Sequence, residues 1–466
     1  MSFSAGEVLR GMTTSAPIAR LRADLNGRVI TPDDAGYEQA RAVFYGSIDR
    51  RPAVIVRPAD ATAVLRAVSL AREGGLELAI RSGGHSLAGH SVSEGGMVLD
   101  LSDMRALEID GEGRTAWAQT GLTAGEYTSA AAAHGLATGF GDTGSVGIGG
   151  LTLGGGVGFL VRKHGLTIDD LLAAEVVTAD GELVYADADT HPDLFWALRG
   201  GGGNFGVATR FQFRLHEVDT IVGGMLILPA TPEVIAAFVA EAEAAPEELS
   251  AIANIMLAPP MPLLPKEAHG KLVVMALLCY AGQVETGERS LARFRALAEP
   301  IADLLRPMRY PEIYQLTEGG PAPTEEVARS LFIHAVDEPA AGAIVDHLQA
   351  STAPLAVAQL RVLGGAMARV PAEATAFAHR RRRLMVALGA VYERVEETPM
   401  HESWVTGFAA ALRQGDASVY VNFLGDEGEA RIREAYPGPT WDRLRAIKSR
   451  YDPTNLFRLN QNIPPA

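Results

Sequence analysis

The sequence predicts an α+β protein of two or three domains, and three observations lead to this fold class. The chain has 466 residues, which is too long for one ordinary hydrophobic core. In the first half, short β-branched runs alternate with helical segments and glycine-rich loops, as in α+β or mixed α/β folds. From about residue 219 to 410, strand and helix patterns are typical of an antiparallel sheet with covering helices.

The first half contains well-marked elements. Asp60 is a predicted helix N-cap, and the helix that it starts ends at the glycine pair 74–75. Asp180-Gly181 predicts a tight hairpin turn. The other expected elements are strands over residues 53–56, 76–80, 97–101, 174–178, 182–185 and 207–215, and helices over 123–134 and 193–198.

The second half is read in the same way. Strands are expected over residues 223–228, 272–278, 384–388 and 420–423, and helices over 232–245, 287–298 and 441–450. The run Arg380 to Arg383 precedes one of these strands, and four consecutive arginines are expected to mark a solvated face.

The composition excludes several classes of function. The formal net charge is −15, from 41 basic and 56 acidic residues, which argues against a nucleic-acid partner. Cys279 is the only cysteine, so no intramolecular disulfide is expected. Residues 1–25 show no apolar core of signal-peptide length, and no stretch approaches about 20 apolar residues, so no membrane partner is expected and a cytoplasmic protein is the default expectation.

The segment Arg81-Ser82-Gly83-Gly84-His85-Ser86 is the most informative stretch for function. Two adjacent glycines permit positive φ, so consecutive main-chain N–H groups can converge on an anion. The arginine and the two serines add donors that suit phosphate oxygens. The pattern therefore indicates a ligand that carries phosphate, with His85 held close to it. The alternative is a turn histidine that only satisfies a hydrogen bond.

A second glycine concentration covers residues 143–158, with eight glycines in sixteen positions. This is too many for a helix or a plain strand. A linker would be polar, whereas this segment carries valine, isoleucine and leucine residues at positions that look buried. A main chain packed closely against a flat or extended ligand explains both features.

Other ligand-binding motifs are disfavoured. Residues 201–206 match G-x-G-x-x-G, but a helix is expected before them and a strand after them, whereas the dinucleotide fingerprint needs the reverse order. No P-loop pattern is present, and residues 141–145 form only a broken G-x-S-x-G. With one cysteine, a thiolate-rich metal site is impossible, and no metal is expected.

Taken together, these motifs resemble the FAD-linked oxidases of the vanillyl-alcohol-oxidase superfamily, in particular bacterial members of the berberine-bridge-enzyme-like group. The His85 loop, the glycine segment, residues 193–206 and residues 451–463 occur in the family's order. The resemblance implies a split FAD-binding domain of the PCMH type, with its core at about 47–218. Residues 1–218 and a C-terminal segment, 411–466, would form this domain, and residues 219–410 would form an inserted substrate domain.

The resemblance also implies the cofactor site. His85 would bond covalently to the 8α-methyl group of FAD, its loop would cradle the pyrophosphate, and the glycine segment would line the flavin. Asp169 would also lie near the cofactor. The implied cofactor-binding residues are His85, Arg81, Ser82, Gly83, Gly84, Ser86, Thr143, Gly144, Val146, Gly147, Gly150, Gly154, Gly155, Gly158, Asp170, Val177, Asn460 and Asn462.

This chain departs from the family pattern at two positions. Bicovalent members carry a cysteine where this chain has Thr143, so a single covalent link is expected. Many alcohol-oxidising members carry a tyrosine base where this chain has Phe423, which cannot accept a proton. The candidate catalytic residues are Tyr420, Asn422 and Val146, the last as the residue beside the flavin that predicts oxygen reactivity. Tyr310, Tyr314 and His334 are further candidates, and each is expected to be structural.

The loss of the phenol favours an amine substrate over an alcohol, because a neutral amine has a lone pair that stabilises the cation left by hydride transfer. The first hypothesis is therefore an FAD-dependent oxidase of a small, hydrophobic, secondary-metabolite-like amine or alcohol, with molecular oxygen as the acceptor. The alternatives are a flavin dehydrogenase that uses another acceptor, and a flavin-binding protein without turnover. The sequence leaves the substrate, the oligomeric state and the pathway open.

Overall fold

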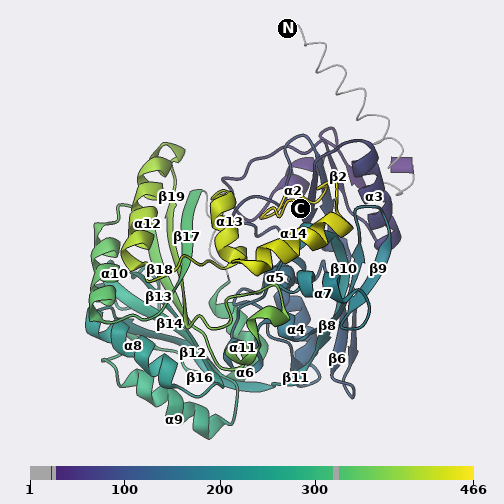
Figure 1. Ribbon diagram of the computed structural model, residues 1–466. Coiled ribbons are helices and arrows are strands. Elements are labelled where there is room, and N and C mark those ends of the chain that lie inside the picture. The colour runs from purple at the N-terminus through teal and green to yellow at the C-terminus, as the bar shows by residue number, and fades with distance from the viewer. Residues whose placement is uncertain (1–21, 24–27, 319–324) are drawn as a thin grey trace.

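The computed structural model describes residues 22–23, 28–318 and 325–466. The stretch 1–25, in which the sequence shows no signal-peptide core, lies almost entirely outside these ranges. Within them, no helix is both long enough and apolar enough to span a bilayer. Figure 1 shows the chain folded into two regions that face each other, with the C-terminal helices between their upper ends.

A small sheet opens the first region, with strand order β1-β2-β4-β3. The two strands β2 and β3 both run parallel to β4, because the helix α3 carries the chain back between them. The α3 helix begins where the sequence predicts, and the Asp60 side chain accepts a hydrogen bond from the Ala63 N–H. The elements are β1 (Val29–Ile30), α2 (Tyr37–Arg41), β2 (Val54–Val56), α3 (Ala61–Glu73), β3 (Leu78–Arg81) and β4 (Met97–Asp100).

A five-stranded antiparallel sheet, β5-β6-β10-β8-β9, completes the strands of the first region, together with the short pair β7 and β11. The hairpin predicted at Asp180-Gly181 joins β8 to β9. The strands are β5 (Leu107–Asp110), β6 (Thr115–Gln119), β7 (Leu136–Ala137), β8 (Leu171–Val177), β9 (Leu183–Asp187), β10 (Val207–Arg214) and β11 (His216–Glu217). The helices are α4 (Ala124–Ala132), α5 (Ile148–Gly154), α6 (Val161–His164) and α7 (Pro192–Leu198).

The second region is an eight-stranded antiparallel sheet in the order β15-β12-β14-β13-β18-β19-β17, with β16 paired to β12. Its strands are β12 (Thr220–Pro229), β13 (Leu249–Leu257), β14 (Leu272–Tyr280), β15 (Ala302–Asp303), β16 (Arg306–Arg309), β17 (Glu325–Ile333), β18 (Leu355–Val362) and β19 (Leu384–Tyr392). The helices α8 (Pro232–Ala244), α9 (Val284–Arg295), α10 (Glu338–Ala350) and α12 (Thr398–Leu412) cover its outer face (Figure 1). The predicted antiparallel sheet with covering helices is confirmed.

The inner face of this sheet is turned toward the first region. Successive side chains of a strand point to opposite faces. In β19, Val386 and Leu388 belong to the outer core with the helices, whereas Met385 packs into the core of the first region. Side chains at alternate positions of β17, β18 and β19 are therefore available to a site between the two regions. The short helix α11 (Ala366–Arg369) lies in the connection between β18 and β19.

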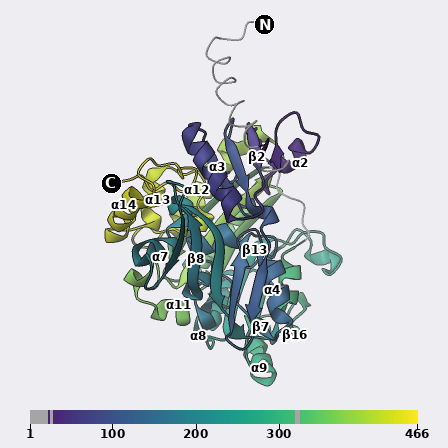
Figure 2. The same ribbon diagram turned by 90° about the vertical axis from the view of Figure 1, so that its right-hand side faces the viewer.

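The end of the chain returns to the first region, and Figure 2 shows α13 (Glu429–Ala435) and α14 (Pro439–Tyr451) on the same side as α7. Arg450 forms a 2.8 Å ion pair with Asp193 of α7. The fully buried Lys448 ammonium pairs with Asp452 and donates to the Asn204 carbonyl at 2.7 Å. The return of the chain agrees with a split domain, while the residue limits 1–218, 219–410 and 411–466 stay a prediction.

Three local expectations differ from the structure. The glycine segment contains the helix α5, which packs against neighbouring elements despite its poor helix formers. Residues 421–423 form one 3-10 turn and not a strand. Arg380, expected on a solvated face, is fully buried and holds the Asp169 carboxylate through two hydrogen bonds of 2.7 and 2.8 Å. Burial of an arginine is tolerated there because its charge is paired.

Candidate functional site

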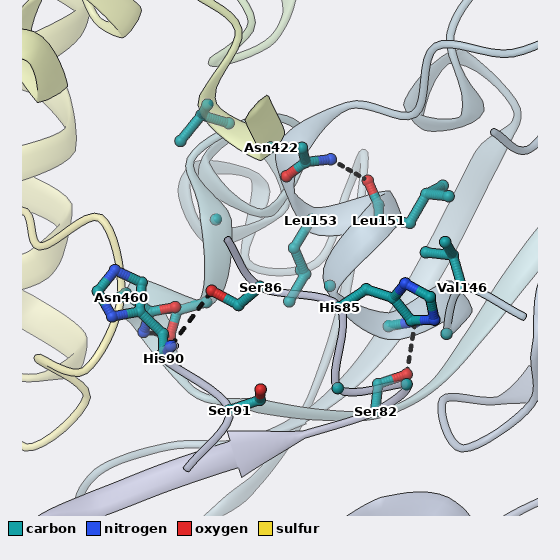
Figure 3. A pocket seen from close by; sticks show the side chains of 18 of the residues that line it. Ser82, His85, Ser86, His90, Ser91, Val146, Leu151, Leu153, Asn422 and Asn460 are labelled. Carbon is teal, nitrogen blue, oxygen red and sulfur yellow. Dashed lines mark hydrogen bonds between the residues drawn. The ribbon is translucent and has the colours of Figure 1, made fainter. Parts of the chain in front are cut away.

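A cavity of about 380 Å³ lies where the His85 loop, the α5 segment and the C-terminal return meet. This volume falls within the usual range for small-molecule sites. Figure 3 shows His85 and Val146 on one side of the cavity and His90 and Asn460 on the other. The predicted site residues that line it are Ser82, Gly83, Gly84, His85, Ser86, Thr143, Val146, Gly147, Gly150, Tyr420, Asn422 and Asn460.

The His85 imidazole is half-buried and stacks on the Phe44 ring, with the ring centroids 4.2 Å apart. Burial lowers the pKa of His85, and a main-chain hydrogen bond with Ser145 acts in the opposite direction. The ring is therefore held neutral near pH 7. A neutral imidazole carries a lone pair on one ring nitrogen, which is what bond formation to a carbon requires.

The two glycine-rich segments approach each other closely through main-chain atoms, and the Ser82 hydroxyl is a side-chain group that also joins them. An ideal Cβ on Gly83 would lie 2.2 Å from the Gly147 nitrogen, closer than any real Cβ contact. Gly84 has a φ of 75°, which favours glycine over all other residues. This part of the cavity wall is therefore main chain, and it leaves N–H groups and space where side chains would otherwise stand.

The polar side chains of the loop are largely used by the protein itself. The buried Arg81 guanidinium donates to the carbonyls of Ala40, Arg41 and Ser91, and it lies outside the cavity lining. The Ser82 hydroxyl donates to the Thr120 carbonyl at 2.5 Å and accepts from the Gly149 N–H. These groups shape the loop, so the donors that face the cavity come mainly from its main chain.

Four of the predicted glycines lie outside the lining and serve close packing. An added Cβ on Gly154 would fall 1.8 Å from the Asn422 Oδ1 atom, and one on Gly158 would fall 1.5 Å from the Phe140 carbonyl oxygen. Gly155 packs against the Tyr420 ring, and the Gly144 carbonyl accepts from a residue of α4. They allow the segments beneath the cavity to approach one another.

The structure also places other predicted residues away from the cavity. Asp170 is buried and hydrogen-bonds His216 at 2.7 Å, and Val177 pairs with Val207 in the five-stranded sheet. Asp169 holds Arg380. Asn462 is outside the lining, although its Oδ1 atom is buried without a hydrogen-bond partner.

Tyr420 and Asn422, from the C-terminal return, also line the cavity. The Tyr420 hydroxyl accepts hydrogen bonds from the Gly156 N–H at 2.7 Å and from the Asn422 amide at 2.8 Å. Asn422 also donates to the Leu151 carbonyl, as Figure 3 shows. Burial raises the pKa of Tyr420 to about 12. The phenol is thus neutral with both acceptor positions occupied, and is poorly suited to accept a proton.

A buried polar chain joins the sheet to the cavity. Arg361 of β18 pairs with Asp142 at 2.6 Å and donates to Gln359, which donates to Asn254. The Arg361 guanidinium also lies 5.1 Å above the centre of the Phe423 ring. Asp142 and Phe423 line the cavity. Because Asp142 offsets the arginine, this chain adds hydrogen-bonding capacity beside the cavity without adding net charge.

Sequence reasoning missed several lining residues. Phe44 and Tyr45 come from the loop after α2, which carries no motif. His90 follows the recognised loop by only four residues, and both of its ring nitrogens are buried without hydrogen-bond partners. Burial lowers the pKa of His90 to about 4, so the ring is neutral. The glycines at 202–206, noted in the sequence for their motif, also line the cavity. Tyr310, Tyr314 and His334 do not line it.

Comparison with known proteins defines the class. The sequence profile described as an FAD binding domain matches residues 52–187, and the profile described as berberine and berberine like matches residues 419–464. (R)-6-hydroxynicotine oxidase of Paenarthrobacter nicotinovorans is 31% identical over 95% of this chain and 97% of its own length. An FAD-linked oxidoreductase of Bacillus subtilis is 32% identical over 95% of this chain and 99% of its own length.

Solved structures agree with this assignment. The crystal structure of 6-hydroxy-D-nicotine oxidase from Arthrobacter nicotinovorans superposes with a TM-score of 0.83 at 29% identity, covering 94% of this chain and 98% of that one. A xylooligosaccharide oxidase in complex with xylobiose gives a TM-score of 0.84 at 25% identity over 97% and 99% of the two chains. The fold is that of a PCMH-type FAD enzyme. The chain belongs to the berberine-bridge-like group of FAD-linked oxidases, and it is an FAD-dependent oxidoreductase.

The residues of the cavity fit this cofactor. The glycine contacts around Gly83 leave a main-chain wall that a phosphate or a flat ring can approach closely. On the far side, the unpartnered ring nitrogens of His90 and hydroxyl of Ser91 are polar groups that await a ligand or water. When bound, FAD supplies an acceptor for a hydride.

Proposed function

We propose that this protein is an FAD-dependent oxidase of small hydrophobic amines, with the flavin attached through His85 and with molecular oxygen as the electron acceptor. The observation that carries the proposal is the contrast between two residues that line the cavity. His85 presents a neutral imidazole at the position where the family resemblance implies attachment. Phe423 has no proton acceptor.

Covalent attachment is supported by the neutrality and the fixed orientation of the His85 ring. Stacking on Phe44 restricts the ring, and its burial keeps one nitrogen unprotonated. Thr143 lines the cavity where a second attachment would need a thiolate, so one link is proposed. Attachment to a histidine would raise the oxidising power of the flavin and prevent its loss.

The amine preference rests on the absence of a general base at Phe423 and on the state of Tyr420. Alcohol oxidation requires removal of a hydroxyl proton as the hydride leaves, whereas a neutral amine already holds its lone pair. Tyr420 has both acceptor positions filled and a raised pKa. Among the relatives, the nicotine-derivative oxidase acts on a substrate that contains nitrogen, which agrees with this proposal.

Oxygen as the acceptor is supported by Val146. Its side chain lines the cavity beside His85, as Figure 3 shows, and it is smaller than the leucines at 151 and 153 that line the same cavity. A small residue there leaves a path for oxygen to the reduced cofactor. Oxygen uptake during turnover distinguishes this proposal from a dehydrogenase that uses another acceptor. Negligible hydrogen peroxide formation would contradict it.

The test of attachment is acid precipitation of the purified holoenzyme. We expect yellow colour to stay with the wild-type pellet and to leave with the supernatant in His85→Ala. His90→Ala is the matched control, because it removes a second imidazole from the same cavity and should leave the colour in the pellet. Free flavin in the wild-type supernatant would overturn covalent attachment. A screen of N-methylbenzylamine and 6-hydroxynicotine against benzyl alcohol and xylobiose then tests the substrate class.

A further inference from the structure

Part of the inner face of the sheet beside the cavity carries small side chains. In β17, the inner positions are Glu326, Ala328, Ser330 and Phe332, because Val327 and Leu331 point into the outer core. Ala328 pairs with Gly389 of β19. Small side chains at adjacent positions of a sheet leave room above it, and any polar group at their margin then faces that room.

This face adjoins the cavity at two points. The Ser330 hydroxyl donates to the Phe423 carbonyl at 3.0 Å, which ties β17 to a lining residue. Burial raises the pKa of Tyr45, another lining residue, and the charge of the nearby Glu326 carboxylate raises it further. Glu326 itself is not a lining residue: it stands on the inner face of β17, near Tyr45 and next to the cavity.

Glu326 differs from the other charged group of this face. Arg361 is neutralised by Asp142, whereas Glu326 makes no hydrogen bond and no ion pair with any residue that the structure describes. Its Oε1 atom would lie 3.9 Å from a Cβ on Gly389, so the carboxylate extends over the glycine. Burial raises the pKa of Glu326 to about 7. A half-buried carboxylate with no cation beside it is unfavourable unless a ligand provides one.

Of the residues that the structure describes around it, Glu326 is the only acidic side chain on this part of the face. The loop after α2 contributes Tyr45, a neutral phenol. The strand β19 contributes Gly389 and Val391, which carry no charge. On its own strand, Glu325 points to the opposite face of the sheet, as does Arg329.

We propose that Glu326 is the substrate-cation site of this enzyme: it holds the ammonium group of the substrate and accepts its proton before the adjacent carbon–hydrogen bond breaks. This inference rests on the proposed function, because it applies to an amine substrate. In the proton transfer the N–H bond breaks, an O–H bond forms on the carboxylate, and the electron pair stays on nitrogen. That lone pair then stabilises the cation left on the substrate when the carbon gives up its hydride.

Other polar groups near the cavity do not suit this role. Gln359 and Asn254 are amides that cannot accept a proton near neutral pH, and they are hydrogen-bonded to each other. Tyr420 is neutral and its acceptor positions are filled. Asp142 is already paired with the Arg361 guanidinium at 2.6 Å, so it is not free to bind a second cation. Asp426, whose charge acts on His90, and Glu318, which lies beside Gly144, are exposed to solvent. Among these described carboxylates, Glu326 is therefore left as the half-buried one that is free to bind a cation.

The test is calorimetric titration of the holoenzyme with benzyltrimethylammonium, a permanent cation with no N–H bond to transfer and no lone pair. A carboxyl with a pKa of about 7 is mostly ionised at pH 8 and mostly protonated at pH 6. We therefore expect the wild-type affinity to fall about tenfold from pH 8 to pH 6. Glu326→Gln should lose at least tenfold at pH 8 and show no dependence on pH. Glu326→Asp should keep the pH dependence.

The matched control is Glu325→Gln, which removes the same charge from the next residue on the opposite face. It should bind the probe as the wild type does. Failure of the wild type to bind the cation at pH 8, or equal binding by Glu326→Gln, would overturn the proposal. Flavin content measured for each variant verifies that the fold is intact.

Turnover with N-methylbenzylamine separates this inference from the proposed function. If amines are oxidised and Glu326→Gln keeps the wild-type kcat and pH profile, the role of Glu326 is overturned and the amine oxidase stands. If no amine is oxidised but the cation binds in a manner that depends on Glu326, the amine oxidase falls and the cation site stands. A fall in kcat of Glu326→Gln, together with loss of the ionisation near pH 7 from its pH–rate profile, supports both the role of Glu326 and the amine oxidase.

Discussion

The two sides of the site are built from different atoms. The glycine wall, residues 82–86 and 146–150, presents main-chain groups and is so closely packed that a Cβ on Gly83 would overlap the Gly147 nitrogen. The sheet wall, the inner face of β17, β18 and β19, stands next to the cavity, and its side chains Arg361 and Ser330 contact the lining residues Asp142 and Phe423. A main-chain wall cannot change its chemistry by substitution, whereas a side-chain wall can.

This difference explains how one fold accommodates different substrates. Relatives that share the fold are named for a nicotine derivative and for xylooligosaccharides. In this chain we expect FAD to be recognised by the glycine wall, which substitution cannot alter without loss of packing. We expect the substrate to meet the side-chain wall, where a single residue such as Phe423 can change the chemistry.

The largest loss of stability is expected from a variant that breaks an ion pair between the two regions of the fold. Arg380, from the segment before β19, is fully buried and grips Asp169 of the first region. Arg380→Ala leaves a buried carboxylate unpaired, and we expect the free energy of unfolding to fall by about 3–5 kcal/mol. Urea unfolding followed by circular dichroism measures this. The exposed neighbour is the control, and Arg381→Ala should change stability by less than about 0.5 kcal/mol. Equal losses of unfolding free energy in the two variants would contradict the conclusion that the ion pair of Arg380 with Asp169 stabilises the fold.

A substitution in the glycine wall should reduce stability less but should strongly reduce the amount of bound flavin. Gly83→Ala forces the loop away from Gly147, and we expect a loss of about 1–3 kcal/mol in unfolding free energy. Because the wall is displaced, the purified protein should hold less than about a tenth of the wild-type flavin, as measured by absorbance. Gly342→Ala in α10, where an added Cβ meets open space, should instead stabilise by about 0.5–1 kcal/mol. Full flavin content in Gly83→Ala would show that this wall tolerates side chains.

The smallest effect is expected from a change in the substrate's surroundings. Phe423→Tyr places a phenol hydroxyl in the cavity beside Arg361, and so provides a group that can exchange a proton with the substrate. We expect kcat/KM for benzyl alcohol to rise about tenfold, because general-base help becomes available, while kcat/KM for N-methylbenzylamine changes less than about threefold. Steady-state assays with both substrates measure this. A gain for the amine alone would show that the missing phenol does not determine the substrate class.

The sequence predicted those elements whose signals are local. The cap at Asp60, the hairpin at Asp180-Gly181 and the strand after the glycines at 201–206 need only neighbouring residues. The helix α5 was missed because Gly149, Gly150 and Gly154 lower helix propensity. Its stability comes instead from contacts with distant residues, including Ser82 and Asn422.

The same limit applies to the site. The His85 loop was identified from its own six residues, and the structure brings five of these to the cavity. Arg81 was assigned to phosphate from its type, but its donors satisfy carbonyls that only the folded chain brings near. Tyr45 and Glu326 have no motif. Their proximity depends on the register between β17 and β19 and on where the loop after α2 lies, and neither can be read from local patterns.

The C-terminal return has a consequence for how the enzyme is made. Residues 420–424 and 459–461 complete the cavity that residues 82–86 begin, and the buried pair of Lys448 and Asp452 fastens this closing segment to Asn204. Chains fold from the N-terminus as they leave the ribosome. The nascent protein therefore has an incomplete site until residues 459–461, which follow its last helix, have emerged. We expect stable cofactor capture to wait for that step, which would make flavin loading one of the last events in maturation.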